Sequence, residues 1–329
     1  MQYKRLGRAG VRVSVLSLGT WLSEDQIAAG QMPLIRQAFD AGVNMFDTAD
    51  AYGEKGEVER AVGRLIKDLP RDEIVVATKC RWGYGGKGEN RRGTSRKHLT
   101  HAIDGSLQRL GLDFVDLYQV HSFDPDTPLD ELVRMMGDLL RQGKILYWGL
   151  SNFNSAQTLW VLKICDQVGV PYPVSTQPEY SILEPGLVEA RGRLYMGLDQ
   201  VCLEFGMGII PYSPLAGGML TGKYRQSVPK GSRLDRRGEQ FREKMQRPQK
   251  VEAVEKLAVI AQQAGLPLAQ MSLAWLIQRP ALTSAIIGAT RPEQLQENLP
   301  AGDLVLAAEV IAAIDKVRDE YKTAIHFLP

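Results

Sequence analysis

Four side chains that can move protons or hold charge lie at or just after the ends of short apolar runs. They are a carboxylate, a phenol, an ammonium and an imidazole, contributed by Asp47, Tyr52, Lys79 and His121. A phenol has an unperturbed pKa of about 10, and an adjacent ammonium lowers it. A carboxylate beside the lysine would keep the ammonium charged, and a neutral imidazole could donate a hydrogen bond to the same substrate oxygen. Together these groups suit the protonation of a carbonyl oxygen whose carbon receives a hydride.

This chemistry implies a nicotinamide cofactor, because no protein side chain is a hydride donor. A second use of the same residues is an isomerase or aldolase in which Lys79 forms a Schiff base with the substrate. The neighbouring Asp47 and Tyr52 favour a charged amine and so favour the first interpretation.

Eight apolar runs, each followed by a longer segment, are expected to position these groups. We expect strands at 15–19, 43–48, 73–79, 114–121, 145–151, 173–177, 207–213 and 283–288. The helices expected between them include 32–42, 95–111 and 128–143, with Ser95 as an N-cap and Gly111 and Gly143 as C-caps. Eight strands alternating with helices predict an α/β fold, a single (β/α)8 TIM barrel over residues 1–329. The carboxyl ends of its strands would bring the four side chains together.

Two segments stand outside this repeat. Residues 2–13 are expected to form a polar β-hairpin, with Gly7 and Gly10 near its turn, that could plug the bottom of the barrel. Residues 217–250 form a connection after the seventh strand that is too long for an ordinary loop and is therefore expected to be functional. The simplest interpretation of residues 225–250 within it is a mobile, hydrated loop, and the alternative is a segment that Lys223 and Arg233 close over a dinucleotide. The basic stretch 81–97 is interpreted either as a solvated loop or as a rim in which Trp82 walls the substrate site and arginines attract anionic carbonyl compounds.

Composition excludes several classes of protein. The chain has 329 residues with 40 Lys and Arg against 38 Asp and Glu, and its net charge of +2 makes nucleic acid an unexpected partner. No apolar stretch reaches the roughly 18 residues of a membrane span, and no signal peptide is expected at the N-terminus. The thiols Cys80, Cys165 and Cys202 form no CxxC pair and indicate a reducing, cytoplasmic location.

Three short motifs suggest other chemistries, and each lacks a required feature. GGMLTGKY (217–224) has Tyr224 where a P-loop needs Ser or Thr. GYGGKG (83–88) does not follow the first strand, as a Rossmann glycine motif would. His98 and His101 lie three residues apart, but no acidic or thiol ligand stands at metal spacing, so we interpret them as a solvated pair and expect no metal.

The sequence resembles the aldo-keto reductase family over nearly its whole length, from RLGRAGVRVSVLSLGT to IIGATRPEQLQENL. FDTADAYG, VVATK and VDLYQVH are similar to the segments that carry the family's catalytic tetrad. The resemblance implies that Tyr52 is the general acid/base, that Asp47 and Lys79 tune it, and that His121 orients the carbonyl group. RRGTSRKHL, YWGLSNF and YSPLAGGMLTGKY are most similar to the branch of potassium-channel β-subunits and bacterial glyceraldehyde-3-phosphate reductase-like enzymes.

The resemblance also implies a site for NADPH/NADP+. The carboxamide is expected at Ser151, Asn152 and Gln177, with Tyr212 against the nicotinamide ring. Further cofactor-binding residues are expected at Gly19, Thr20, Trp21 and Asp47. Ser213, Pro214, Leu215, Ala216, Gly217, Lys223 and Arg233 would follow the pyrophosphate, and Gly288, Thr290, Arg291, Gln294, Glu297 and Asn298 the adenosine. Thr290 and Arg291 would open a short helix, and Arg291 would pair with a 2′-phosphate, which predicts a preference for NADPH over NADH.

The predicted function is the NADPH-dependent reduction of aldehydes, and of some ketones, to alcohols. Trp21, Tyr52, Trp82 and His121 are expected to line the site of the small carbonyl substrate. The alternative is an NADP(H)-bound redox-sensing or regulatory subunit with slow turnover. The branch resemblance also implies a homo-oligomer, a tetramer or larger. Because the chain begins at the hairpin, we do not expect a pore-blocking N-terminal segment.

Overall fold

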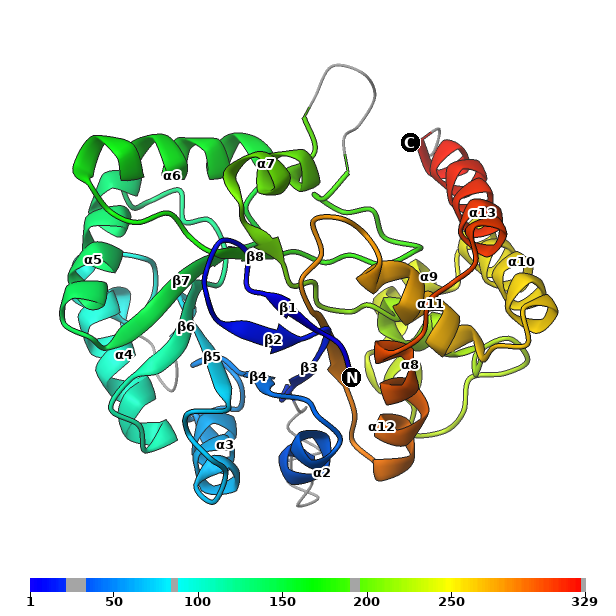
Figure 1. Ribbon diagram of the computed structural model, residues 1–329, viewed down its shortest axis with the longest axis horizontal. Helices are drawn as coiled ribbons and strands as arrows, with labels where there is room; N and C mark the ends of the chain where they lie inside the picture. The colour runs from blue at the N-terminus through cyan, green and yellow to red at the C-terminus, as the bar shows by residue number, and fades with distance from the viewer. Residues whose placement is uncertain (22–33, 84–87, 190–195, 327–329) are drawn as a thin grey trace.

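The computed structural model describes residues 1–21, 34–83, 88–189 and 196–326. Eight parallel strands form one sheet in the order β10-β3-β4-β5-β6-β7-β8-β9. Figure 1 labels β3 to β8 of this sheet. They are β3 (Leu16–Gly19), β4 (Met45–Asp47), β5 (Val75–Cys80), β6 (Val115–Val120), β7 (Ile145–Ser151), β8 (Ser175–Gln177), β9 (Gly208–Ile209) and β10 (Ala285–Gly288). The eight predicted strands are confirmed, and the seventh is the most shortened.

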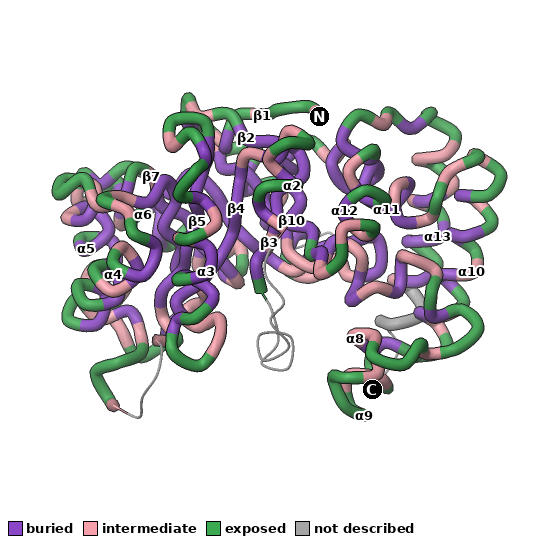
Figure 2. Tube along the Cα trace, turned by 90° about the horizontal axis from the view of Figure 1, so that it is seen from below, coloured by how far each residue is buried: buried purple, intermediate pink, exposed green. Residues whose placement is uncertain are grey.

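Backbone hydrogen bonds join the last strands and close the sheet. The Ile209 N–H donates to the Ala281 carbonyl (2.9 Å), and the Ile209 carbonyl accepts from the Thr283 N–H (2.8 Å). The Ile286 N–H donates to the Pro211 carbonyl (2.9 Å). The strands are buried along most of their length (Figure 2), as expected for parallel strands covered on both faces. The architecture is therefore the predicted (β/α)8 barrel.

Helices flank the strands on the outside of the barrel (Figure 1). They are α2 (Ile35–Asp40), α3 (Glu57–Ile66), α4 (Arg96–Leu110), α5 (Leu129–Arg141), α6 (Ser155–Val168), α7 (Leu198–Phe205), α10 (Pro248–Gln263), α11 (Leu268–Ile277), α12 (Pro292–Asn298) and α13 (Ala308–His326), with 3-10 turns η1 (Glu89–Arg91), η2 (Ala216–Thr221) and η3 (Leu299–Gly302). The predicted caps of α4 are confirmed, since the Ser95 hydroxyl accepts from the His98 N–H (3.3 Å) and Gly111 is left-handed at φ 67°. Helix α5 is capped by Gln142 rather than by Gly143, which follows it at φ 70°. The first two residues predicted for α2, 32 and 33, lie outside the described part of the chain.

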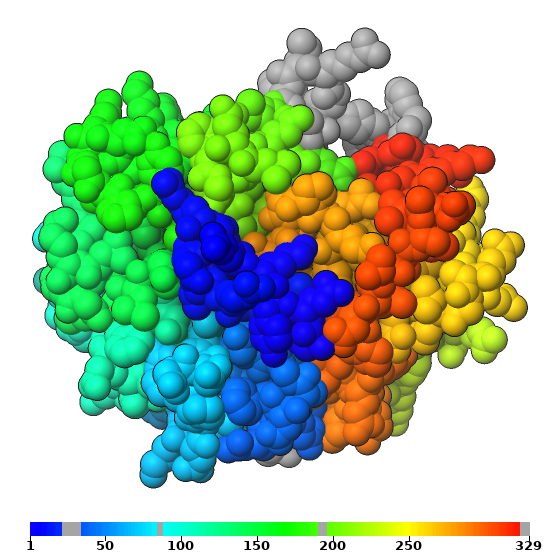
Figure 3. Space-filling view, viewed as in Figure 1, coloured from blue at the N-terminus to red at the C-terminus, as the bar shows by residue number. Residues whose placement is uncertain are grey.

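The N-terminal hairpin plugs one end of the barrel, as predicted. Strands β1 (Tyr3–Arg5) and β2 (Arg12–Ser14) pair antiparallel. Leu6 and Val13 are fully buried and share one apolar cluster with barrel residues such as Leu117. Figure 3 shows the hairpin lying across the centre of this face of the molecule.

Gly7 lets the hairpin approach the barrel closely. It has φ +56°, and a Cβ there would lie 2.1 Å from the carbonyl oxygen of Val174. We expect Gly7→Ala to lower the free energy of unfolding by about 2–4 kcal/mol, from left-handed strain and overpacking. Gly10→Ala is the matched control, because a Cβ at Gly10 meets nothing within 4 Å. Urea titration of the two variants checks this, and equal stabilities would contradict it.

The connection after β9 differs from the hydrated loop that its composition predicts. It contains η2 and two short helices, α8 (Arg233–Arg236) and α9 (Glu239–Met245). Leu234 and Met245 are buried in the main apolar core, and the Ser232 hydroxyl caps α8 by accepting from the Asp235 N–H (3.4 Å). Apolar packing therefore gives this segment a defined structure.

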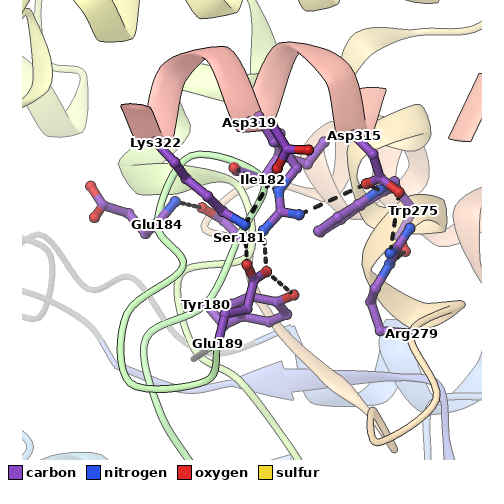
Figure 4. Close-up of polar contacts among 11 residues, drawn as sticks. Tyr180, Ser181, Ile182, Glu184, Glu189, Trp275, Arg279, Asp315, Asp319 and Lys322 are labelled. Carbon is purple, nitrogen blue, oxygen red and sulfur yellow. Dashed lines mark hydrogen bonds and ion pairs between the residues drawn. The ribbon is translucent and has the colours of Figure 1, made fainter. Parts of the chain in front are cut away.

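A partly buried ionic network holds α13 against the segment that follows β8 (Figure 4). The Glu189 carboxylate accepts hydrogen bonds from the Tyr180 hydroxyl (2.7 Å) and from the side chains of Arg318 and Lys322. Arg318 also donates to the Ile182 carbonyl (3.2 Å). Helix α13 thereby fixes the position of the segment that follows β8.

Candidate active site

The structure brings the Lys79 ammonium into contact with the carboxylate and the phenol expected beside it. Its Nζ donates to Asp47 Oδ2 (2.6 Å), to the Thr48 carbonyl (2.8 Å) and to the Tyr52 hydroxyl (3.3 Å). Lys79 is fully buried at the end of β5, and Asp47 is the last residue of β4. All three donors of the ammonium are used, so the site is built for a charged lysine.

His121 reaches this group from the adjacent strand end. Its ring lies edge-on to the Tyr52 ring, with centroids 6.0 Å apart. Burial, and then the positive charges of Lys79 and Arg81, lower the pKa of His121 to about 3. The imidazole is therefore neutral at physiological pH and can donate one hydrogen bond.

The pKa shifts of the lysine and the phenol correct one expectation. Burial lowers the pKa of Lys79, but the adjacent Asp47 carboxylate and Tyr52 outweigh it, so the net pKa is raised. Burial raises the pKa of Tyr52, and the opposing effect of Lys79 does not cancel it. The expected lowering of the phenol pKa is therefore wrong for this structure, because the desolvation of a phenolate outweighs the nearby ammonium. The phenol is a proton donor at neutral pH.

Two buried amides hold the second oxygen of Asp47. Oδ1 accepts from Gln177 Nε2 (2.8 Å) and from Gln119 Nε2 (3.2 Å). The amide nitrogen of Gln177, which we expected at the nicotinamide carboxamide, is thus committed to the Asp47 carboxylate. Gln119 was missed from the sequence, although a polar residue two positions before His121 in a buried strand shares its face and could have signalled it.

Ser151, Asn152 and Tyr212 form a second hydrogen-bonded group at the same edge of the barrel. The Asn152 amide donates to the His121 carbonyl (3.0 Å) and to the Ser151 hydroxyl (3.1 Å), and it accepts from the Tyr212 hydroxyl (3.1 Å). Asn152 has φ +56°, a left-handed conformation that asparagine tolerates better than most residues. The structure thus links three residues expected at the nicotinamide to one another and to the backbone of His121. Thr20, at the neighbouring strand end after Gly19, donates to the Asp47 carbonyl (3.0 Å).

The segment expected along the pyrophosphate is tightly turned. Ser213, Ala216 and Gly217 have φ between +48° and +65°, and Pro214 and Leu215 lie between them. The Arg233 guanidinium has a buried Nε with no hydrogen-bond partner among the described residues. An unmatched, partly buried cation beside such a turn fits an anionic phosphate. Lys223, exposed in the same connection, could join it.

The residues expected at the adenosine lie at the end of β10 and in and just before the short helix α12, and the predicted helix after the eighth strand is confirmed. Gln294 Oε1 accepts from the Thr290 N–H (2.9 Å), the Thr290 hydroxyl (3.2 Å) and the Arg291 N–H (3.3 Å). The backbone donors expected to bind an anion are therefore satisfied by Gln294 in this structure. The Arg291 side chain is exposed, as are Gly288 and Glu297, and Asn298 is buried.

The two tryptophans expected at the substrate site are exposed, and arginines contact both rings. The Trp21 ring lies 5.5 Å from the Arg233 guanidinium and 4.5 Å from that of Arg237, while Arg81 lies 3.9 Å from the Trp82 ring. Residues 84–87, in the middle of the basic stretch, lie outside the described residues.

The interpretation of His98 and His101 as a solvated pair is wrong for one member, because His98 is buried against the barrel and only His101 is exposed.

Comparison with known proteins agrees with this geometry. Residues 15–319 match the model of the Aldo/keto reductase family. The chain belongs to the aldo/keto reductase family. This aldo/keto reductase is 37% identical to a probable voltage-gated potassium channel subunit beta of Oryza sativa subsp. japonica, and the match covers 96% of each chain. It is 35% identical to a putative voltage-gated potassium channel subunit beta of Schizosaccharomyces pombe, over 96% of this chain and 92% of the relative. It is also 35% identical to L-glyceraldehyde 3-phosphate reductase of Escherichia coli K12, again over 96% of this chain and 92% of the relative. The predicted branch is thereby confirmed.

Neither a membrane-spanning helix nor a cluster of metal ligands is present in the described part of this aldo/keto reductase. Within the described residues, no helix has the length and apolar character needed to cross a bilayer. The same residues contain no group of three or more His, Cys, Asp or Glu side chains that could hold a metal ion.

Proposed function

We propose that the protein is an NADPH-dependent reductase that converts aldehydes, and some ketones, to alcohols in the cytoplasm. The observation that carries the proposal is the Lys79 ammonium, which contacts both the Asp47 carboxylate (2.6 Å) and the Tyr52 hydroxyl (3.3 Å). Membership of the aldo/keto reductase family and a relative named L-glyceraldehyde 3-phosphate reductase support the same reaction class.

Each residue of the site has a defined task in this proposal. A bound nicotinamide supplies the hydride. Tyr52 donates its proton to the carbonyl oxygen as negative charge develops there, and the Lys79 ammonium stabilises the phenolate that remains. Asp47 keeps the ammonium charged, and His121 donates a hydrogen bond that orients the carbonyl oxygen. A Schiff base on Lys79 is disfavoured, because it needs a neutral amine and the three contacts hold the charged form.

The pH dependence of reduction follows from the two shifted groups. Because the pKa of His121 is lowered to about 3, the imidazole does not titrate near its ordinary value of about 6.5. Because the pKa of Tyr52 is raised, the phenol keeps its proton through the neutral range. We expect kcat for reduction to show no inflection from either group through the neutral range, because His121 titrates only near pH 3 and Tyr52 only at strongly alkaline pH.

Asp50 supplies the control for this profile. Its carboxylate is buried two residues before Tyr52, and burial followed by the charge of Glu59 raises its pKa to about 7. A shallow inflection near pH 7 is therefore expected, and Asp50→Asn should remove it. An inflection that persists in this variant would show that His121 or Tyr52 titrates in the neutral range, against the expectation for both groups.

Arg291 is proposed to set the cofactor preference by pairing with the 2′-phosphate of NADPH. Arg291→Ala should weaken NADPH binding by roughly 10- to 100-fold, the worth of a charge-assisted hydrogen-bond pair, and should change NADH binding little. Fluorescence titration with both nucleotides measures this. Equal losses for the two nucleotides would contradict the assignment.

The decisive experiment is a panel of aldehydes, including methylglyoxal, glyceraldehyde 3-phosphate and nitrobenzaldehyde, assayed by NADPH absorbance. Brisk reduction supports the proposal. Slow turnover of every aldehyde, with NADP+ retained through purification, would support instead a redox-sensing subunit, the candidate that the potassium-channel relatives favour.

A further inference from the structure

Arg81 stands beside the imidazole at the carboxyl edge of the barrel. Strands β5 and β6 pair Cys80 with Val120, and the next N–H, that of His121, donates to the Cys80 carbonyl (3.0 Å). Arg81 is therefore the first residue after β5, directly across from His121. Neither proton donation nor carbonyl orientation, as proposed above, uses its side chain.

The backbone of Arg81 is held in a conformation that arginine rarely adopts. Its φ is +129°, and its carbonyl accepts from the Gly93 N–H (2.7 Å). A non-glycine residue in such a region costs about 1–3 kcal/mol and persists where the surrounding structure enforces it, often at a functional site. The strained turn fixes where the side chain leaves the strand end.

The partly buried guanidinium of Arg81 lacks the anionic partner that the buried Arg109 has. It lies 3.9 Å from the Trp82 ring, and its Nε is buried without a hydrogen-bond partner in the described residues. No described carboxylate forms an ion pair with it, whereas Arg109 is paired with Glu59 (2.7 Å). A stacked guanidinium keeps its planar edge free for two parallel hydrogen bonds to a carboxylate or phosphate.

The charge of Arg81 also reaches the reacting groups. It contributes to the lowered pKa of His121, after burial and Lys79. An unneutralised cation within electrostatic reach of the carbonyl-orienting imidazole would attract a substrate that carries negative charge near its carbonyl group.

We propose that Arg81 is a specificity-determining residue that binds an anionic group on the substrate, so that the preferred substrates are short aldehydes bearing a carboxylate or phosphate. Trp82 supports the guanidinium by stacking. The substrate class in this inference rests on the proposed reductase function. The position and charge of Arg81 do not depend on the proposed proton transfer from Tyr52.

The test compares two matched pairs of aldehydes in Arg81→Met, which keeps the side-chain bulk and the backbone conformation and removes the charge. The pairs are 4-carboxybenzaldehyde with its methyl ester, and glyceraldehyde 3-phosphate with glyceraldehyde. We expect the ratio of kcat/KM for the charged over the neutral member to fall by about 10- to 100-fold. Arg81→Lys should retain part of the ratio, because it keeps the charge without the planar fork.

Arg92→Met is the matched control, because it removes the same charge from the same loop at an exposed residue paired with Glu89 (3.5 Å). It should leave the ratio unchanged. Equal losses for charged and neutral aldehydes in Arg81→Met would show a structural role and overturn the proposal. If the kcat/KM ratio fell for only one pair of aldehydes, that pair would identify whether Arg81 binds a carboxylate or a phosphate.

A binding measurement separates this inference from the proposed function. Calorimetric titration of the wild-type protein with 4-(hydroxymethyl)benzoate, with and without NADPH, requires no turnover. Binding that weakens about ten-fold or more in Arg81→Met supports the anion site even if no aldehyde is reduced. No difference between wild type and variant would overturn it, whatever the reductase activity.

Discussion

Replacing Tyr52 with Phe should lower kcat for aldehyde reduction by roughly 10²- to 10⁴-fold, the usual contribution of a positioned general acid. The variant keeps the ring that packs edge-on to His121 and loses only the hydroxyl that Lys79 contacts at 3.3 Å. NADPH binding should be nearly unchanged, because none of the residues expected at the nucleotide is removed. Stopped-flow measurement of NADPH oxidation separates the loss of chemistry from any change in product release.

Tyr172→Phe is the control for this substitution. Its hydroxyl donates to Asp166 (2.7 Å) at the surface and contacts none of the four proposed catalytic residues. The control should retain wild-type kcat. Activity at the wild-type level in Tyr52→Phe would show that another group protonates the carbonyl, whatever the spacing of the phenol and the ammonium.

The positions of the four side chains could be predicted from the sequence because a parallel barrel gives each strand end a known place. Asp47, Lys79 and His121 each follow an apolar run, and the closed sheet brings those ends to one edge. Tyr52 lies only five residues beyond Asp47, so it cannot be far from the same edge. The spacing of these residues and the parallel direction of the strands were sufficient to predict this part of the site.

The features that could not be predicted from the sequence depend on how completely each side chain is buried. The composition around Tyr52 shows an ammonium nearby but not how completely water is excluded, and the desolvation of the phenolate determines the direction of its pKa shift. His98 is buried for a similar reason, since the face that α4 presents to the barrel depends on packing. The short helices after β9 form because Leu234 and Met245 find an apolar partner that is distant in sequence.

The hydrogen-bond partners inside the barrel could not be predicted from the sequence either. Gln177 is expected at the nicotinamide because of a family resemblance, yet its amide donates to Asp47 from across the barrel (2.8 Å). Gln119 enters the same network through the register of β5 and β6. Such contacts depend on strand stagger and barrel closure, which the pattern of apolar runs does not specify.

Replacing Lys79 with Met should both abolish the proposed chemistry and destabilise the fold. The ammonium is fully buried and its partner Asp47 is 3% exposed, so the substitution leaves a buried carboxylate without its counter-charge. Breaking such a pair typically costs about 3–5 kcal/mol. A lower denaturation midpoint and a kcat as low as that of Tyr52→Phe are therefore expected together.

The double variant Lys79→Met/Asp47→Asn separates these two effects. Asparagine keeps an oxygen where Asp47 Oδ1 accepts from Gln177 (2.8 Å) and Gln119 (3.2 Å), and it removes the uncompensated charge. Most of the lost stability should return, because replacing both members of a buried ion pair costs far less than removing one. Activity should stay low, since no ammonium remains to stabilise the Tyr52 phenolate. If the double variant were as unstable as the single one, the loss would come from packing around Lys79, and the charge coupling argued for this site would be wrong.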